Sequence, residues 1–247
     1  MATSSRDDVR RLYGDLAWTW PVFSSAEEYV EESEQFARLI RQYAEIEVRT
    51  LLNLGSGAGR NDYTLKKRFQ VTGVDISEGM QEIAKRLNPE VHYVLGDMRS
   101  LPLSQSFDAV VSFDSIDYMQ TRDDLQAAFR TAFLHLKPGG VFVTYQEDIP
   151  GRFEQNHTKV HIGAAADVEL VFIENSYDPD PTDTTYECTF VYLIRRSGRL
   201  QIETDQHILG LFETGTWLEL LKKTGFDIKA VSDETPEEAI TFVCVKP

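Results

Sequence analysis

Between residues 50 and 145, short continuous apolar runs alternate with longer amphipathic stretches. The runs predict strands at 50–54, 71–75, 91–95, 108–113 and 140–145. The amphipathic stretches predict helices at 58–68, 78–87 and 122–136. Strands that are apolar on both sides are typical of a parallel sheet whose two faces are covered by helices. The pattern therefore predicts an α/β fold with an open, doubly wound sheet, which binds ligands beyond the carboxyl ends of its strands.

The alternation stops between about 147 and 212. Here period-two apolar residues predict antiparallel strands at 168–173, 186–194 and 200–211, after which a helix at 214–224 and strands at 226–231 and 239–245 complete the first pattern. We therefore expect one domain formed by 1–146 and 213–247, with 147–212 as a β insertion. Inserted segments at strand ends commonly carry specificity, so the insertion is a natural cover for a substrate site.

The first part of this domain, residues 1–46, is predicted to be a helical arm rich in aromatic side chains. Ser25 and Glu28 have the spacing of a capping box at the start of one helix. Tyr13 and Tyr29 fit two interpretations: they pack against the core, or they belong to a lid that covers a bound cofactor.

The first strand runs into a glycine-rich turn, Leu51-Leu-Asn-Leu-Gly-Ser-Gly-Ala-Gly-Arg60, and the second strand ends in the carboxylate of Asp75. Such a turn lets backbone N–H groups and a helix N-terminus approach a ligand. An acid at the tip of the next parallel strand can accept hydrogen bonds from both ribose hydroxyls. The pair predicts a nucleoside-cofactor site, although Asp75 also fits a simple turn.

Other positions narrow the choice of cofactor. A dinucleotide fingerprint would place its third glycine at position 60, which is Arg60, so the spacing disfavours a nicotinamide dehydrogenase. Asp97 follows the third strand, where a carboxylate can accept the exocyclic amine of an adenine or can form a polar turn. The segment Leu136-Lys-Pro-Gly-Gly140 ends a helix and leads into the fifth strand.

In their order and spacing these segments resemble class I S-adenosylmethionine-dependent methyltransferases, whose domain is Rossmann-like. The resemblance covers residues 50 to 145 and rests on Leu52-Asn-Leu-Gly-Ser-Gly-Ala-Gly-Arg60, Gly73-Val-Asp-Ile-Ser-Glu-Gly-Met80, Gly96-Asp-Met-Arg99, Phe107-Asp-Ala-Val-Val-Ser-Phe113 and Leu136-Lys-Pro-Gly-Gly140. More narrowly, the chain is similar to the small sugar-amine N-methyltransferase branch. That likeness rests on Tyr13, Tyr29-Val-Glu-Glu32, Ser112-Phe-Asp-Ser-Ile-Asp-Tyr118 and Asp205-Gln-His-Ile-Leu-Gly-Leu-Phe212.

The resemblance implies a site for S-adenosylmethionine formed by Tyr13, Tyr29, Asn53, Gly55, Ser56, Gly57, Asp75, Ile76, Met80, Asp97, Met98 and Phe113. In it, backbone amides of the glycine turn hold the aminocarboxypropyl group, Asp75 holds the ribose and Asp97 holds the adenine amine. Ile76 and the two methionines contact the adenine, unless they are simply core residues. Asn53 stands where the family usually has Asp; it keeps an acceptor but loses the charge, so we expect weaker or water-mediated cofactor binding.

Methyl transfer needs mainly alignment, which is worth up to ~7–11 kcal/mol, so a neutral amine acceptor requires no dedicated base. Asp114 and Asp117 follow the fourth strand, where the family presents residues toward the transferring methyl group. They replace Ser and Gly of the branch pattern, and they also fit a solvated acid and a helix cap. His207 could remove a proton near neutral pH, or it could be structural.

The composition restricts the other classes. The 247 residues are 42% hydrophobic and 26% charged, and the net charge of −15 disfavours a nucleic-acid substrate. A polar N-terminus and the lack of an apolar run of ~20 residues predict a cytoplasmic protein that does not span a membrane. Cys188 and Cys244 predict buried free thiols, and no cluster has the spacing of metal ligands.

The sequence thus predicts an S-adenosylmethionine-dependent methyltransferase that acts on a small polar molecule, and the leading hypothesis is N-methylation of an amine such as an amino sugar. The alternatives are O-methylation of a small acid or hydroxyl, and a catalytically silent cofactor-binding module. The identity of the acceptor and of any general base stays open, and the sequence is compatible with a homodimer.

Overall fold

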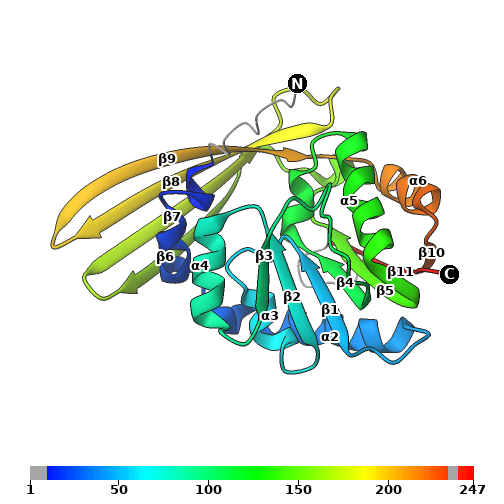
Figure 1. Ribbon diagram of the computed structural model, residues 1–247. Helices are drawn as coiled ribbons and strands as arrows, with labels where there is room; N and C mark the ends of the chain where they lie inside the picture. The colour runs from blue at the N-terminus through cyan, green and yellow to red at the C-terminus, as the bar shows by residue number, and fades with distance from the viewer. Residues whose placement is uncertain (1–9, 233–238) are drawn as a thin grey trace, which may run out of the picture.

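The computed structural model describes residues 10–232 and 239–247, and its larger layer is a seven-stranded sheet with the order β10-β11-β5-β4-β1-β2-β3 (Figure 1). The strands are β1 (Thr50–Leu54), β2 (Gln70–Asp75), β3 (His92–Leu95), β4 (Phe107–Ser112), β5 (Leu136–Gln146), β10 (Asp227–Ser232) and β11 (Ile240–Val245). The first five are mutually parallel, and the last two add an antiparallel edge beside β5. The prediction of an open α/β sheet is confirmed.

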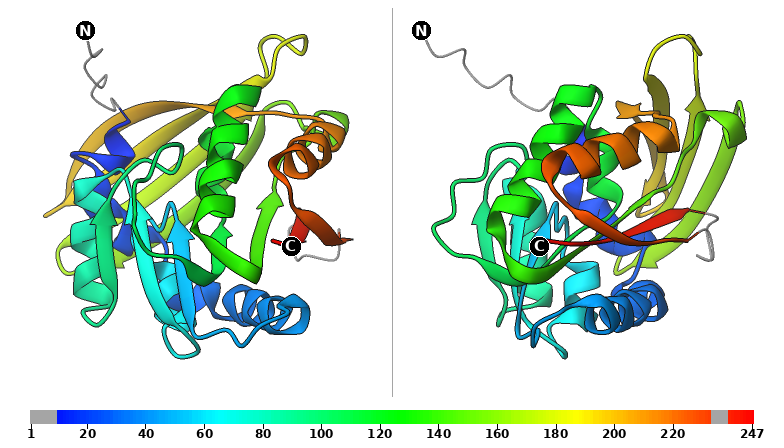
Figure 2. Two further views of the ribbon diagram at one scale, coloured as in Figure 1. Left: turned by 45° about the vertical axis from the view of Figure 1, so that its right-hand side comes forward. Right: turned by 90° about the vertical axis from the view of Figure 1, so that its right-hand side faces the viewer.

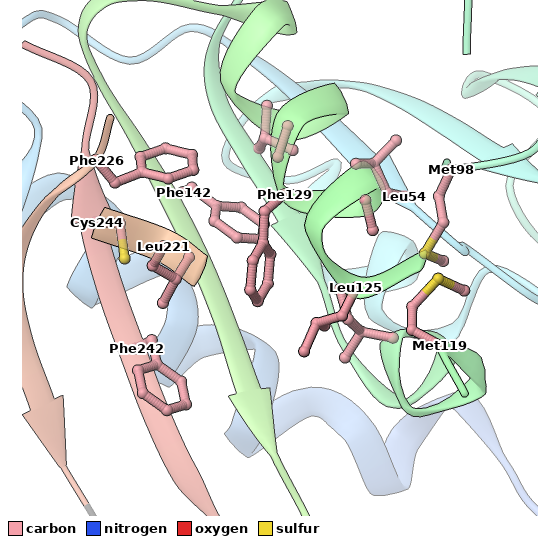
Figure 3. Close-up of a cluster of buried hydrophobic side chains, with 14 of the residues drawn as sticks. Leu54, Met98, Met119, Leu125, Phe129, Phe142, Leu221, Phe226, Phe242 and Cys244 are labelled. Carbon is pink, nitrogen blue, oxygen red and sulfur yellow. The ribbon is translucent and has the colours of Figure 1, made fainter. Parts of the chain in front are cut away.

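Helices cover both faces of this sheet. On one face lie α5 (Arg122–His135) and α6 (Thr214–Thr224), and on the other lie α2 (Val30–Tyr43), α3 (Arg60–Leu65) and α4 (Glu78–Leu87). Under α5, Phe129 packs edge-on against Phe142 of β5 (Figure 3). Burial on both faces is why the strands read as continuous apolar runs. Within the described ranges, no helix is both long and apolar enough to cross a bilayer.

A second sheet is an antiparallel meander of β6 (His157–Ala165), β7 (Val168–Tyr177), β8 (Thr185–Arg196) and β9 (Arg199–Gly210) (Figure 2). The sequence predicted its last three strands but missed β6. This edge strand exposes most of its side chains and therefore lacks an alternating apolar pattern. The connecting segments include the 3-10 helices η4 (Asp114–Tyr118) and η5 (Pro150–Arg152).

The N-terminal arm lies between the second sheet and α4 (Figure 1). It consists of η1 (Arg11–Tyr13), η2 (Ala17–Thr19), α1 (Trp20–Phe23) and η3 (Ala26–Tyr29), and the predicted capping box of Ser25 and Glu28 is present. Phe23 stacks on Phe172 of β7 with 4.3 Å between ring centroids. Gly163 permits this approach, because a Cβ there would lie 1.8 Å from the carbonyl oxygen of Val22. The part of the predicted arm at 1–9 lies outside the described residues.

Candidate functional site

A cavity of about 480 Å³ lies beyond the carboxyl ends of β1, β2 and β4, and side chains of the arm and of β9 complete its wall. Its volume is in the range of small-molecule sites. Every residue predicted to bind the cofactor lines it except Asn53, and so does Asp114. The other two predicted catalytic residues, Asp117 and His207, lie behind the wall. The sheet thus brings together segments that are up to about two hundred residues apart in the chain.

The glycine turn forms the floor of this cavity. Gly55, Gly57 and Gly59 all have positive φ angles, a conformation that favours glycine. The N–H groups of Gly55 and Ser56 donate to the carbonyl oxygen of Val74, at 2.7 and 2.9 Å. The predicted amide cradle is therefore engaged within the protein. What the turn offers a ligand here is open space at Gly57, where a Cβ would meet nothing within 4 Å.

Two acids line the nucleoside end. Asp75 is oriented by two backbone amides: its Oδ2 accepts from Gly57 N at 2.7 Å and its Oδ1 from Ser77 N at 2.8 Å. A carboxylate so held keeps further lone pairs for hydroxyl donors. Asp97 pairs with Arg99 at 2.6 Å. Burial raises the pKa of Asp97, but the bonds from Arg99 more than offset this, so its pKa lies below the ordinary value and the acid stays ionised.

The arm both packs against the domain and lines the cavity, so the two interpretations of its tyrosines are compatible. Ser77 Oγ donates to the carbonyl oxygen of Tyr13 at 2.6 Å. Arg60 holds the arm from below, because its Nη1 donates to Ser24 Oγ at 2.6 Å and its Nη2 to the carbonyl oxygen of Trp20 at 2.8 Å. Sequence reasoning used Arg60 only to exclude a fingerprint and missed this cation, since nothing local shows that the arm folds over it.

The acids after β4 face different ways. Asp114 lines the cavity and accepts a hydrogen bond from the hydroxyl of Tyr145. Asp117 is buried away from the cavity, where burial and the nearby charges of Glu147 and Asp148 raise its pKa well above the ordinary value. In the part of the chain that the structure describes, no group of three or more His, Cys, Asp or Glu side chains is arranged to hold a metal ion.

His207 is fully buried and does not line the cavity itself. Its Nδ1 lies 2.6 Å from the hydroxyl of Tyr118, and its Nε2 lies 2.8 Å from Oδ2 of Asp205. Tyr118 lines the cavity and accepts a hydrogen bond from the hydroxyl of Tyr13 at 2.8 Å. The sequence proposed His207 alone. It missed Tyr118 as a partner because this residue comes from a separate element, η4. It missed Asp205 because an acid two residues before a histidine on the same strand is not a recognised motif.

Asn53 lies beneath the glycine turn in a buried polar network. Its Nδ2 donates to Oδ1 of Asp62 at 2.8 Å, and the hydroxyl of Tyr93 donates to the other carboxylate oxygen at 3.0 Å. Burial raises the pKa of Asp62 to about 6, although both donors counteract it. An amide at position 53 is therefore accounted for locally: it donates to Asp62, whereas the family's usual Asp would face that carboxylate.

Comparisons with known proteins show which proteins this chain is similar to. Residues 51–140 match the family model described as a methyltransferase domain. A dTDP-3-amino-3,4,6-trideoxy-alpha-D-glucopyranose N,N-dimethyltransferase from Streptomyces venezuelae is 36% identical over 118 residues, which span 47% of this chain and 49% of that protein, or about half of each. A dTDP-4-amino-2,3,4,6-tetradeoxy-D-glucose N,N-dimethyltransferase from Saccharopolyspora spinosa is 28% identical over 80% of this chain and 79% of its own length.

Among solved structures, the sugar N-methyltransferase KedS8 from a Streptoalloteichus species superposes with a TM-score of 0.84 at 22% identity. The match covers 100% of this chain and 97% of that one. DesVI from Streptomyces venezuelae gives a TM-score of 0.82 at 24% identity over 94% of this chain and 96% of its own. These likenesses extend the shared fold beyond residues 51–140 to the arm and the second sheet.

The network beneath the turn yields a stability prediction. Asn53→Asp sets a second carboxylate against Asp62, and an unsatisfied buried charge costs at least ~1–3 kcal/mol, so we expect the melting temperature at pH 7 to fall by several degrees. The native state favours protonated Asp62, so this group's contribution to stability is present below about pH 3.8 and is lost as the pH rises through about 6. At pH 5 Asp62 is largely protonated and no longer repels a carboxylate at position 53. The difference in melting temperature between the variant and the wild type should therefore shrink between pH 7 and pH 5.

Asn175→Asp on β7 is the matched control, since Asn175 lies in the second sheet and bonds to Thr158 instead. Calorimetric or fluorescence melting curves at both pH values make the comparison. An unchanged melting temperature for Asn53→Asp at pH 7, or a deficit that is equal at both pH values, contradicts the account of this network.

Proposed function

We propose that this chain, which belongs to the class I S-adenosylmethionine-dependent methyltransferases, N-methylates the amine of a sugar. The observation that carries the proposal is one cavity with two chemically different ends. The nucleoside end has Asp75 and Asp97, and the opposite end has the carboxylate of Asp114 beside tyrosine hydroxyls. The names of the two relatives, both amino-sugar N,N-dimethyltransferases, support the same class of acceptor.

The cavity fits S-adenosylmethionine part by part. Asp75 offers acceptors to ribose hydroxyls, and Asp97 offers one to the adenine amine. Ile76, half exposed at the cavity, and the buried Met80 provide apolar surface for the base. Arg60 is a cation at the cavity wall that suits the cofactor carboxylate. When bound, the cofactor supplies an electrophilic methyl group on a sulfonium.

The protein's own contribution is to align the acceptor and exclude water. Aromatic side chains of Phe113, Trp20 and Tyr29 form much of the wall where the arm closes on the sheet. A dry site favours attack by a neutral amine, and alignment is worth up to ~7–11 kcal/mol. The carboxylate of Asp114 attracts a cationic amine into the cavity and disfavours an acidic acceptor.

Asp75→Ala tests the nucleoside end. Removing an acceptor for two hydroxyl groups should weaken binding of S-adenosylmethionine at least ~100-fold, because each bond to a charged group is worth ~1.5–3 kcal/mol. Titration calorimetry with the cofactor and with its demethylated product makes the measurement. Asp167→Ala, at an exposed turn between β6 and β7, should leave the dissociation constant unchanged. Wild-type protein that binds NAD but neither of these ligands would sink the proposal.

Asp114→Asn tests the acceptor end. The substitution keeps the size of the side chain and removes its charge, so we expect KM for amines to rise about tenfold, or ~1.4 kcal/mol, with little change in cofactor binding. Turnover is compared across a panel of amino sugars, simple amines, small acids and hydroxyl compounds. An equal loss for acids would contradict the role of Asp114. Cofactor binding without turnover on the whole panel would instead favour the silent module.

We further propose that residues 147–212 cover the acceptor, which Gln206 and Ile208 of β9 support by lining the cavity. A cytoplasmic location and the lack of a nucleic-acid partner stay predictions from composition.

We also propose a homodimer that forms through the outer face of the second sheet. Its register places Ile162, Val171, Leu193 and Ile202 in one row, and Ile162 and Ile202 are 78% and 60% exposed. Such apolar surface is typical of an interface.

Ile162→Asp should shift the sedimentation coefficient from that of a dimer to that of a monomer, because it places a charge at the most exposed position of this row. Leu134→Asp is the matched control: Leu134 is 67% exposed, but on α5. A monomeric wild type, or a dimer that is unaffected by Ile162→Asp, excludes this interface.

A further inference from the structure

A continuous line of hydrogen bonds runs from the cavity into the second sheet. It begins at Tyr13, passes through Tyr118 and His207, and ends at Asp205, with donor–acceptor distances of 2.8, 2.6 and 2.8 Å. The two tyrosines line the cavity, whereas the histidine is fully buried. The line therefore connects the acceptor end of the cavity to an ionisable group that a ligand cannot touch.

The direction of the hydrogen bonds follows from the last acid. Oδ2 of Asp205 also accepts from Leu12 N at 2.7 Å. Burial raises the pKa of Asp205, but the bonds from His207 and Leu12 outweigh it, so the pKa lies below the ordinary value and the group is a carboxylate. Nε2 of His207 must then be the donor, which leaves Nδ1 with a lone pair that accepts from the hydroxyl of Tyr118.

We propose that His207 receives the proton that the acceptor ammonium must lose, through Tyr13 and Tyr118, and this inference rests on the proposed N-methylation. An amine of this kind is largely protonated at neutral pH and has no lone pair for attack until it loses a proton. The N–H bond of the ammonium breaks as its proton moves to Oη of Tyr13. The hydroxyl proton of Tyr13 moves to Tyr118, and that of Tyr118 moves to Nδ1 of His207. Only protons move in this sequence, and no group is oxidised or reduced.

The surroundings suit this transfer. The imidazolium that forms faces the carboxylate of Asp205, which offsets its charge. Burial raises the pKa of both tyrosines, so neither accumulates as a phenolate and the protons move together. Two further groups lie near the imidazole ring of His207. Phe190 has its ring centroid 4.4 Å from that of His207, and Cys188 is the residue of β8 that pairs with His207 of β9. Burial raises the pKa of the Cys188 thiol to about 12, so it stays neutral.

Arg10 is the other charge near this line, and it comes from the arm. Its guanidinium lies 4.1 Å from the ring centroid of Tyr118 and 5.1 Å from that of Tyr13. A cation in this position stabilises negative charge that develops on either phenol oxygen while a proton is in transit. It also opposes a lasting positive charge on the imidazole, which favours return of the proton to solvent after each turnover.

The test is the pH dependence of kcat/KM with an amino-sugar substrate. With the relay intact, activity should persist well below the pKa of the amine, because the enzyme itself takes up the proton of the bound ammonium. Tyr118→Phe keeps the ring but removes the hydroxyl that links cavity and histidine. Its kcat/KM should fall about tenfold per pH unit below the pKa of the amine itself, which is ~8 for an amine of the α-amino type, and should approach the wild-type value above pH 9.

Tyr192→Phe is the matched control. It removes a hydroxyl from a buried tyrosine of β8 that has no hydrogen-bond partner among the described residues. Its pH profile should follow that of the wild type. His207→Gln should reproduce the shift of Tyr118→Phe, and titration with S-adenosylmethionine shows that each variant is folded and binds the cofactor.

A Tyr118→Phe profile that runs parallel to the wild type, or coincides with it, overturns the relay even if His207→Gln fails to fold. The proposed function fails in a different way: the wild type then binds the cofactor but methylates no amine at any pH. Turnover by the wild type with an unshifted Tyr118→Phe profile rejects the relay alone.

Discussion

The carboxylate of Asp75 joins the segments on which the site depends. Its two oxygens accept from Gly57 in the glycine turn and from Ser77 at the start of α4. The hydroxyl of Ser77 in turn holds the backbone of Tyr13. One acid at the tip of β2 therefore fixes the floor of the cavity, the helix beside it and the arm above it. A residue that is predicted to bind the ribose also sets the geometry of the pocket that receives it.

From Tyr13 the same connection continues into the second sheet through Tyr118 and His207. The arm is consequently more than a cover, because it links the nucleoside end of the cavity to the acceptor end. Arg60 and Arg10 lie at the cavity although the chain carries a net charge of −15. The net charge describes the protein as a whole. At the cavity, Arg10 lies over tyrosine rings, and Arg60 lies in the wall where it can bind an anionic group of a ligand.

The comparisons and the geometry support different parts of the functional account. The methyltransferase model matches only residues 51–140, which carry the glycine turn, Asp75 and Asp97. At the acceptor end, Asp114 and Tyr118 also lie within that range, whereas Tyr13 comes from the arm and Gln206 and Ile208 come from β9. Recognition of the cofactor is therefore the better supported half, and the choice of acceptor depends also on segments outside the range that the family model matches.

The sequence by itself determined the parallel sheet, the glycine turn and the acids at the strand ends, because each depends on residues that are neighbours in the chain. It placed His207 in a strand but could not supply Tyr118, which lies 89 positions away and meets it only when η4 packs against β9. Asn53 shows the same limit: the sequence marked it as a departure, and the fold explained it through Asp62. The exposed strand β6 left no apolar pattern to read. Local patterns decide elements, but contacts between distant side chains exist only once those elements are packed.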